Sequence, residues 1–210
     1  RLIRSKCSIV GMRVFDKYFQ MLEKIIEKAE IYGGHGSGPR PEPLVIQIFG
    51  ASGCGKSHVP YFLAADLCVW ENAEGSPVEH MYYRKTSNEY FDGYKPGKHL
   101  MCVYDDFGQG KDSQTKPNEE FMELIYACNI AEWPLHMATL QEKACTYFNS
   151  KMILLTSNCV RYNIQSMTFP EAFVRRIDLR FEISIDPKYK NAHGGIDADK
   201  VAKLHPGEDG

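Results

Sequence analysis

The chain has 210 residues, of which 43% are hydrophobic and 25% charged, and its net charge is −2. These values are ordinary for a soluble globular protein. They exclude a broadly basic nucleic-acid-binding chain, so a nucleic-acid partner would need a local basic groove or pore. No apolar run approaches the length of a membrane span, and no secretory signal is visible. The first residue is Arg, which favours a fragment of a longer protein or a processed product.

Seven cysteines occur at irregular spacing, and no two of them form a C-x-x-C pair. This pattern gives no zinc signature. We expect reduced thiols in a cytosolic protein, several of them buried as small hydrophobic side chains.

Residues 1–32 form a predicted N-terminal helical extension, since apolar side chains recur at helical spacing between residues 12 and 31. The polar side of this segment carries mixed charges, which favours a helix docked on the domain over a helix lying on a membrane surface. The apolar stripe of this helical segment consists of Phe15, Phe19, Leu22, Ile26 and Ala29, widened by Met21 and Ile25.

Residues 33–42 are rich in Gly and Pro and predict a flexible linker.

The compact core is predicted over residues 43–186. It opens with the apolar run Leu44–Phe49, typical of a buried parallel strand. A helix is expected over Val59–Trp70, with Pro60 tolerated in its first turn. Between them lies a full match to the pattern G-x-x-x-x-G-K-[ST], in which backbone N–H groups surround phosphate oxygens, the Lys reaches the β- and γ-phosphates, and the Ser holds Mg²⁺. The predicted nucleotide-binding residues are Gly50, Ala51, Ser52, Gly53, Cys54, Gly55, Lys56, Ser57 and His58.

Further strands are expected at residues 80–84, 100–104, 151–156 and 179–185, and a helix at residues 118–129. Strands that alternate with helices predict an α/β fold, with a central parallel five-stranded sheet and helices on both faces. Residues 187–210 are rich in Gly, Asp and Lys, and predict a flexible tail.

The predicted strand at residues 100–104 is followed directly by two acids, Asp105 and Asp106. A carboxylate delivered beside a phosphate loop completes the Mg²⁺ site of such enzymes, so Asp105 is assigned to the metal together with Ser57. Asp106 is assigned to orient or deprotonate the attacking water. An acidic turn is the alternative, and the phosphate loop favours the functional interpretation. The guanine-reading motif N-K-x-D does not occur, which favours ATP or a loosely selected NTP.

Asn158 follows the next apolar strand, where it would face the γ-phosphate and position a water. The alternative is an Asn that simply starts a turn. Arg175 and Arg176 follow 17 and 18 residues later. Paired arginines are often plain surface charges, but they also serve as arginine fingers that stabilise charge on a transferring phosphoryl group.

These motifs, in this order, closely resemble the superfamily 3 helicase/ATPase of picornavirus-like positive-strand RNA viruses. Three further stretches strengthen the resemblance, which covers roughly residues 43–186. They are Glu89–Tyr94, Pro134–Lys143 and Phe148–Lys151.

The resemblance implies an AAA+ (P-loop NTPase) core that assembles into a hexameric ring, with ATP and Mg²⁺ bound between subunits. Arg175 and Arg176 would then act on the nucleotide of the next subunit. It also implies a role in RNA genome replication in the host cytoplasm, at intracellular membranes, with other viral replication proteins as partners. The membrane would be reached through segments outside this chain, and single-stranded RNA would pass through the ring pore.

Three functions remain open. The first is an NTP-driven motor acting on RNA, and the second is an ATPase without strand separation that serves as an oligomeric RNA-binding or membrane-remodelling scaffold. The third, a small-molecule kinase, explains neither Asn158 nor the arginine pair. A motor needs basic or aromatic residues in the pore, for which Lys111–Lys116 and Leu135–Lys143 are candidates, although solvated loops are the commoner interpretation.

Overall fold

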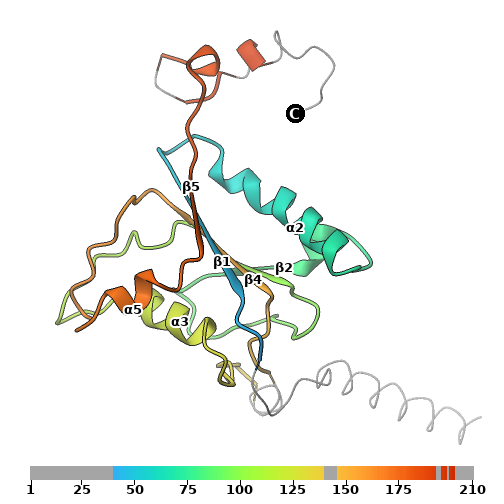
Figure 1. The fold of residues 1–210 in the computed structure, drawn as a ribbon, viewed down its shortest axis with the longest axis vertical. Helices are drawn as coiled ribbons and strands as arrows, with labels where there is room; N and C mark the ends of the chain where they lie inside the picture. Colours follow the sequence, from blue (N-terminus) through green and yellow to red (C-terminus); the bar gives the residue numbers. More distant parts are fainter. Residues whose placement is uncertain (1–39, 140–145, 193–194, 198, 202–210) are drawn as a thin grey trace, which may run out of the picture.

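Five parallel strands form the centre of the computed structural model, which describes residues 40–139, 146–192, 195–197 and 199–201 (Figure 1). The strand order in the sheet is β2-β3-β4-β1-β5, and all four pairings are parallel. The α/β fold with a parallel five-stranded sheet is therefore confirmed. The strands are β1 (Leu44–Phe49), β2 (Met81–Arg84), β3 (Met101–Tyr104), β4 (Met152–Ser157) and β5 (Leu179–Glu182).

Strand β5 ends three residues earlier than the sequence predicts. Its four residues pair with Ile46–Phe49 of β1, so the ladder stops where β1 turns into the glycine-rich loop. The N–H group of Ile183 still donates to the carbonyl oxygen of Phe49 at 2.8 Å, and the chain then leaves the sheet. The end of a strand therefore depends on its neighbour as well as on its own apolar run.

Helices cover both faces of the sheet (Figure 1). Helix α2 (Val59–Trp70) lies on one face, and α3 (Glu119–Ala127) and α5 (Glu171–Val174) lie on the other. The side chain of Asn118 caps α3 by accepting a hydrogen bond from the N–H group of Glu120 at 3.1 Å, a strong N-terminal signal. The predicted helix within residues 12–31 lies outside the described residues, as does the linker up to residue 39. Short 3₁₀ turns are η1 (Lys56–His58), η2 (Pro77–His80) and η3 (Pro187–Tyr189).

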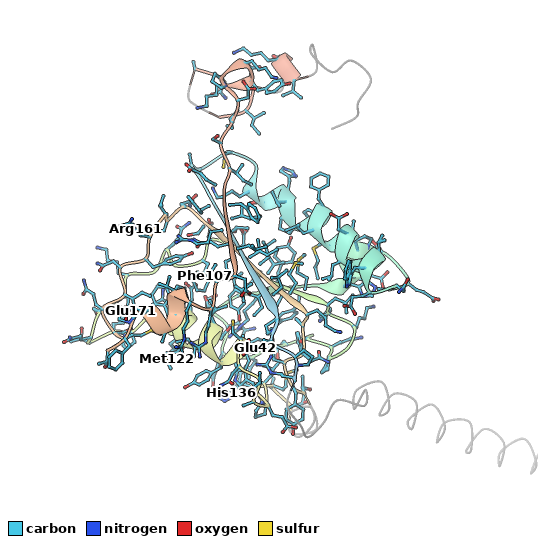
Figure 2. All side chains as sticks on the ribbon, in the orientation of Figure 1. Glu42, Phe107, Met122, His136, Arg161 and Glu171 are labelled. Carbon is cyan, nitrogen blue, oxygen red and sulfur yellow. The ribbon has the colours of Figure 1, made fainter. Side chains whose placement is uncertain are left out.

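Aromatic rings fill the layer between the sheet and the two helices α3 and α5. Phe107, labelled in Figure 2, is fully buried there. Its ring stacks on that of Phe173, with centroids 5.9 Å apart. Phe121 of α3 meets both rings edge-on at 5.8 and 5.1 Å. Phe107 directly follows the acidic pair, so this packing fixes the backbone from which both acids project.

The cysteines that the structure describes are free thiols, as predicted, and all but Cys159 are buried. Burial raises the pKa of Cys102 and Cys128 well above the ordinary thiol value. These groups therefore act as small apolar side chains.

A buried ion pair joins the edge strand β2 to helix α3. Arg84 Nε and Nη2 donate to the two carboxylate oxygens of Glu123 at 2.8 and 2.9 Å, and the Arg84 side chain is only 4% exposed. The hydroxyl of Tyr104 donates to the same carboxylate at 2.9 Å. Burial disfavours the charge of Arg84, but the hydrogen bonds and charge of Glu123 outweigh it, so the pKa of Arg84 is raised.

Replacing Glu123 with Gln should lower the free energy of unfolding by about 3 kcal/mol, because it leaves the Arg84 guanidinium buried without a counter-charge. Urea unfolding followed by circular dichroism measures this loss. The matched control is Glu79→Gln, which removes an exposed ion pair with Lys98 at 2.9 Å and should change stability little. Equal losses in the two variants would contradict the role given to Glu123.

Candidate functional site

A cavity of about 550 Å³ opens at the carboxyl ends of β1, β3 and β4. The glycine-rich loop, the acidic pair and Asn158 all line it, so the fold brings these predicted groups together. Open α/β sheets bind ligands at this edge. The lining residues are Ser52, Gly53, Gly55, Lys56, Ser57, His58, Asp105, Asp106, Gln109, Asn158 and Ile196.

Glycines shape the loop that follows β1. Gly53 and Gly55 have φ angles of 76° and 92°, in the left-handed region that glycine adopts without strain. A Cβ atom on Gly50 would lie 2.2 Å from the carbonyl oxygen of Ile183, so only glycine fits where the loop leaves the sheet. Sterics therefore require glycine at position 50, and backbone conformation favours it at positions 53 and 55.

The Lys56 side chain is buried within this loop, at 7% exposure. Its Nζ donates to the carbonyl oxygens of Gly50 at 3.0 Å and Ala51 at 2.8 Å, and lies 3.8 Å from the Cys54 sulfur. These acceptors are neutral, and an anionic oxygen makes a stronger, charge-assisted hydrogen bond with an ammonium group. An anion in the cavity can therefore replace the loop carbonyls as the hydrogen-bond acceptor of Lys56.

The acidic pair is bound to the end of β4 through Thr156. The Thr156 hydroxyl donates to the Asp105 carboxylate and accepts from the N–H group of Asp106 at 3.1 Å. Asp106 has a φ angle of 54°, an uncommon conformation for a residue other than glycine. Asn158 Nδ2 lies 3.4 Å from Asp106 Oδ1, so the amide and this carboxylate face each other.

The site offers hard oxygen donors of the kind that Mg²⁺ prefers. The Ser57 hydroxyl is exposed next to Lys56, and both carboxylates are exposed to the same cavity. Mg²⁺ is commonly held by one or two carboxylates plus substrate phosphates and waters. Within the described part of the chain, no three His, Cys, Asp or Glu side chains gather as a metal-binding group. The residues present therefore fit a Mg²⁺ carried in with a phosphate better than a metal held by protein alone.

Asp112 fastens the loop that carries the acidic pair. Its carboxylate accepts from the N–H groups of Asn118 at 2.8 Å, Gln165 at 2.6 Å and Ser166 at 2.8 Å. Burial disfavours its charge, but these N–H donors outweigh that effect and lower the pKa of Asp112 to about 2. Asp112 thereby joins the segment after β3 to the segment after β4.

Ile196 reaches the cavity from the region predicted as a flexible tail. Described parts of this region form η3 and an isolated bridge between Lys190 and Ile196, and Asp197 N donates to the Tyr189 carbonyl at 2.8 Å. Sequence reasoning missed both Ile196 and Gln109 as lining residues. Gln109, four positions after Asp105, could have been found by its nearness to the acids, whereas Ile196 has no local signal.

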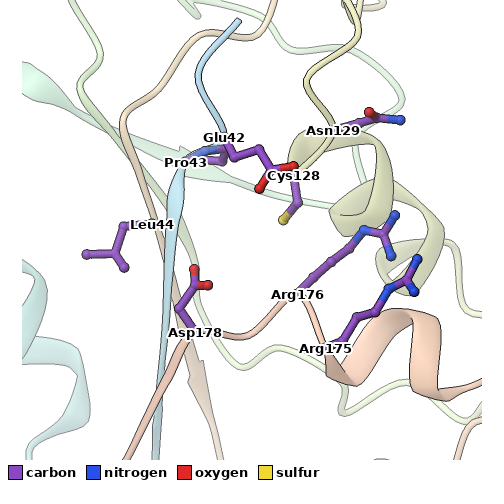
Figure 3. A pocket seen from close by; sticks show the side chains of 8 residues that line it. All are labelled: Glu42, Pro43, Leu44, Cys128, Asn129, Arg175, Arg176 and Asp178. Carbon is purple, nitrogen blue, oxygen red and sulfur yellow. The ribbon is translucent and has the colours of Figure 1, made fainter.

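The arginine pair lies elsewhere. Arg175 and Arg176 line a second cavity, of about 580 Å³, together with Leu44 at the opposite end of β1 (Figure 3). The six residues of β1 separate this cavity from the glycine-rich loop by about 20 Å, at 3.3 Å per residue. Arg176 Nη1 donates to the Ala172 carbonyl oxygen, while Arg175 is exposed. Within one chain, the arginines and the loop do not share a site.

The strand–loop–helix unit and the acids beside it define a P-loop NTPase. A family model described as RNA helicase matches residues 46–159. The chain belongs to this family, in its superfamily 3 branch found in picornavirus-like viruses, and the family uses nucleotides. The match lies inside the predicted core of residues 43–186, whose boundaries stay a prediction.

Curated relatives are viral polyproteins. The chain is 42% identical over 173 residues to the replicase polyprotein of acute bee paralysis virus (strain Rothamsted), a match that covers 80% of this chain and 9% of that protein. It is 39% identical over 145 residues to the replicase polyprotein of cricket paralysis virus, covering 68% of this chain and 8% of that protein. It is 31% identical over 167 residues to the genome polyprotein of human hepatitis A virus genotype IIIA, covering 80% and 7%. The chain thus spans less than a tenth of these relatives.

Replacing Asp112 with Asn should destabilise the protein by about 1–2 kcal/mol at neutral pH, because a charged acceptor of three N–H groups is lost. The folded-state pKa of about 2 lies below the ordinary value of 3.8, so this contribution is complete above about pH 5 and is lost as the pH falls towards 2. Urea unfolding of both proteins at pH 7, 4 and 3 measures it. A difference in stability that did not shrink between pH 4 and pH 3 would contradict the assignment.

Proposed function

We propose that this chain is the ATPase domain of a viral RNA helicase, which hydrolyses ATP to ADP and phosphate during RNA genome replication. The observation that supports this most is that Lys56, Ser57, Asp105, Asp106 and Asn158 line one cavity. A phosphate loop alone binds nucleotide, whereas hydrolysis also needs a group that positions and activates water. The facing carboxylate of Asp106 and amide of Asn158 supply such groups.

Each side chain has a distinct role in this proposal. Lys56 would leave the carbonyls of Gly50 and Ala51 and offset charge on the γ-phosphate. Ser57 and Asp105 would hold Mg²⁺, which when bound neutralises charge on the β- and γ-phosphates. Asp106 would accept a proton from the attacking water, and Asn158 would orient that water. Thr156 keeps Asp105 at a fixed angle by donating to one of its oxygens.

Arg175 and Arg176 would complete the site of a neighbouring subunit. Phosphoryl transfer is strongly accelerated by an arginine that neutralises transition-state charge, about 10³–10⁵-fold in systems with a supplied finger. Since β1 separates the pair from the loop of its own chain, a neighbour is the simplest source of such an arginine. A closed ring, a hexamer as the family resemblance implies, would give every subunit one neighbour on each side.

A mixing experiment tests both the site and the ring. Lys56→Ala and Arg176→Ala chains should each lose ATP turnover by about 100-fold or more, because each lacks one stabiliser of phosphoryl charge. Mixed in equal amounts, they should recover part of the activity, since some interfaces would join an intact loop to an intact arginine. Phosphate release over a range of mixing ratios gives the measurement.

The matched control mixes Lys56→Ala chains with Lys56→Ala, Arg176→Ala double-variant chains, which can form no intact interface. This mixture should stay inactive. Full activity of Lys56→Ala alone would sink the active-site assignment. Inactivity of the first mixture at every ratio, with assembly intact by light scattering, would argue against arginines acting between subunits.

The proposed cellular setting follows from the relatives. A chain within a replicase polyprotein would work in the host cytoplasm with other replication proteins. RNA passing through the ring pore and attachment to intracellular membranes through other segments belong to the same proposal. Among the described residues, no helix has the length and apolar character needed to cross a bilayer.

An ATPase without unwinding activity, serving as an oligomeric scaffold, has the same catalytic residues and is the second candidate. Strand displacement on duplex RNA, measured beside ATP turnover with and without single-stranded RNA, separates the two. A motor should unwind the duplex only with ATP and hydrolyse ATP faster with RNA, with Lys56→Ala as the control. Absence of both unwinding and RNA stimulation would favour the scaffold.

A further inference from the structure

Gln47 is the one polar residue of β1, and its side chain is 0% exposed. Its partner in register on β4, Leu155, belongs to the core on the face covered by α3 and α5. Paired residues in neighbouring strands point to the same face, so the Gln47 amide is buried on this side of the sheet. A buried amide lowers stability unless its donors and acceptor have hydrogen-bond partners. The partners of Gln47 therefore show which segments this amide joins.

The Gln47 amide has partners on the edge strand β5 and in the chain after Asn158. Its Oε1 accepts from Nε of Arg180, its pairing partner on β5, at 2.8 Å. Its Nε2 donates to the Tyr162 hydroxyl at 2.8 Å and to the Cys159 carbonyl oxygen at 3.4 Å. A guanidinium only donates and a carbonyl oxygen only accepts, so these partners fix the orientation of the amide.

Arg180 also binds the chain after Asn158 directly. Its Nη2 donates to the carbonyl oxygen of Val160, while its Nε is bound to Gln47. The planar guanidinium presents its donors in a rigid fork, which allows one side chain to bind two acceptors at once. Arg180 thus connects β5 to β1 and to residues 159–162, which we name the Asn158 loop.

The Asn158 loop is fixed at its two ends by buried residues and in its middle by the hydrogen bond from β5. At its start, Ser157 is fully buried in β4. At its end, the ring of Tyr162 meets that of Phe173 edge-on, with centroids 5.4 Å apart. Val160, between these two points, is 56% exposed, so its position depends more on the bond to the guanidinium than on packing.

The position of this loop decides where the Asn158 side chain points. Asn158 is exposed, and its Nδ2 lies 3.4 Å from Asp106 Oδ1, beyond the usual range of about 2.7–3.2 Å for such hydrogen bonds. A contact of this length is too weak to hold the amide by itself, so the backbone on either side must hold it. A small shift of the loop would therefore turn the amide away from the carboxylate.

We propose that Arg180 is a positioning residue for ATP hydrolysis, which keeps the Asn158 amide facing Asp106 by holding the Asn158 loop. This inference rests on the proposed function, in which Asn158 orients the attacking water. Arg180 is absent from the described residues that line the cavity, and its Nε and Nη2 are bound to Gln47 and Val160. It therefore acts on the loop and not on the nucleotide.

Replacing Arg180 with Ala in the full chain should reduce kcat for ATP about 10- to 100-fold, because small displacements of a group that orients a reactant are costly. The KM for ATP should change less than about twofold, since the glycine-rich loop keeps its contacts. Arg180→Lys keeps the charge, but its single ammonium group cannot reproduce the planar fork, so it should recover only part of the loss. Phosphate release over a range of ATP concentrations separates kcat from KM.

The matched control is Arg40→Ala. Arg40 Nε and Nη2 donate to the carbonyl oxygens of Ala131 at 3.1 Å and Tyr126 at 2.7 Å, close to the start of β1 and away from the cavity. This variant removes as many hydrogen bonds as Arg180→Ala, so a general loss of structure would affect both alike. Its kcat should stay within about twofold of the parent value. Equal kcat losses in the two variants, with both shown to be folded by urea unfolding, would overturn the proposal.

A double-mutant cycle with Asn158→Ala tests whether Arg180 acts through Asn158. If it does, Arg180→Ala should lower kcat by less than about twofold in the Asn158→Ala chain, because the amide that it positions is already gone. The same fold reduction in both backgrounds would overturn the proposal, since a merely structural role gives additive losses. Parent-like kcat in Arg180→Ala, with Lys56→Ala inactive, would also overturn it and would leave the proposed function standing.

Hydrogen exchange measures the loop in the nucleotide-free chain, and so does not depend on the proposed function. The Cys159 N–H group donates to the Ser157 hydroxyl at 3.0 Å, at the start of the loop. This amide should exchange at least about threefold faster in Arg180→Ala than in the parent chain or in Arg40→Ala. Equal exchange in all three would overturn the proposal. Full activity of Lys56→Ala would instead contradict the proposed function and, with it, the role in hydrolysis, while faster Cys159 exchange would still identify Arg180 as the residue that holds the loop.

Discussion

The chemistry of this protein depends on parallel pairing between neighbouring strands. Because β1, β3 and β4 run in one direction and lie side by side, their carboxyl ends meet at one edge of the sheet. The register brings the loop after Phe49, the acids after Tyr104 and the amide after Ser157 to the same level. A reversed β3 would move its two carboxylates to the far end of the sheet. Every assignment at the cavity relies on this one constraint.

At that edge, a few hydrogen bonds fix the relative positions of the side chains. Thr156 is almost fully buried and binds both acids, one through its carboxylate and the other through its backbone. The left-handed Asp106 lies between two fixed points: its own N–H group bonds to Thr156, and the next residue, Phe107, packs against Phe173. Strained residues persist only where surrounding structure over-determines them, and such positions are concentrated at functional sites. The aromatic core therefore supports the site as well as stability.

The sequence predicted the local structure around the cavity well where short segments carry the whole signal. The loop pattern, the apolar strands and the two acids each lie within a few residues, so their local structure follows from spacing and composition. Ile196 and Asp112 were not predictable in this way, because Ile196 reaches the cavity from a distant part of the chain and Asp112 binds the N–H groups of Gln165 and Ser166, more than 50 residues away. The place of Arg175 and Arg176 likewise depends on which end of β1 the chain returns to, and no local pattern encodes that.

The self-contained hydrogen bonding of Lys56 has a consequence for the energetics of ligand exchange. The ammonium group already has two acceptors in its own loop, so the glycine-rich loop keeps this conformation without an anion. In the function proposed above, an incoming phosphate would replace these bonds instead of adding to them, and the lysine would contribute only the difference in strength. When a product departs, the same carbonyls are ready to receive the ammonium, so no buried charge is stranded. The ammonium group of Lys56 therefore has hydrogen-bond acceptors whether or not an anion is bound, and an anion would bind more weakly for having to replace them.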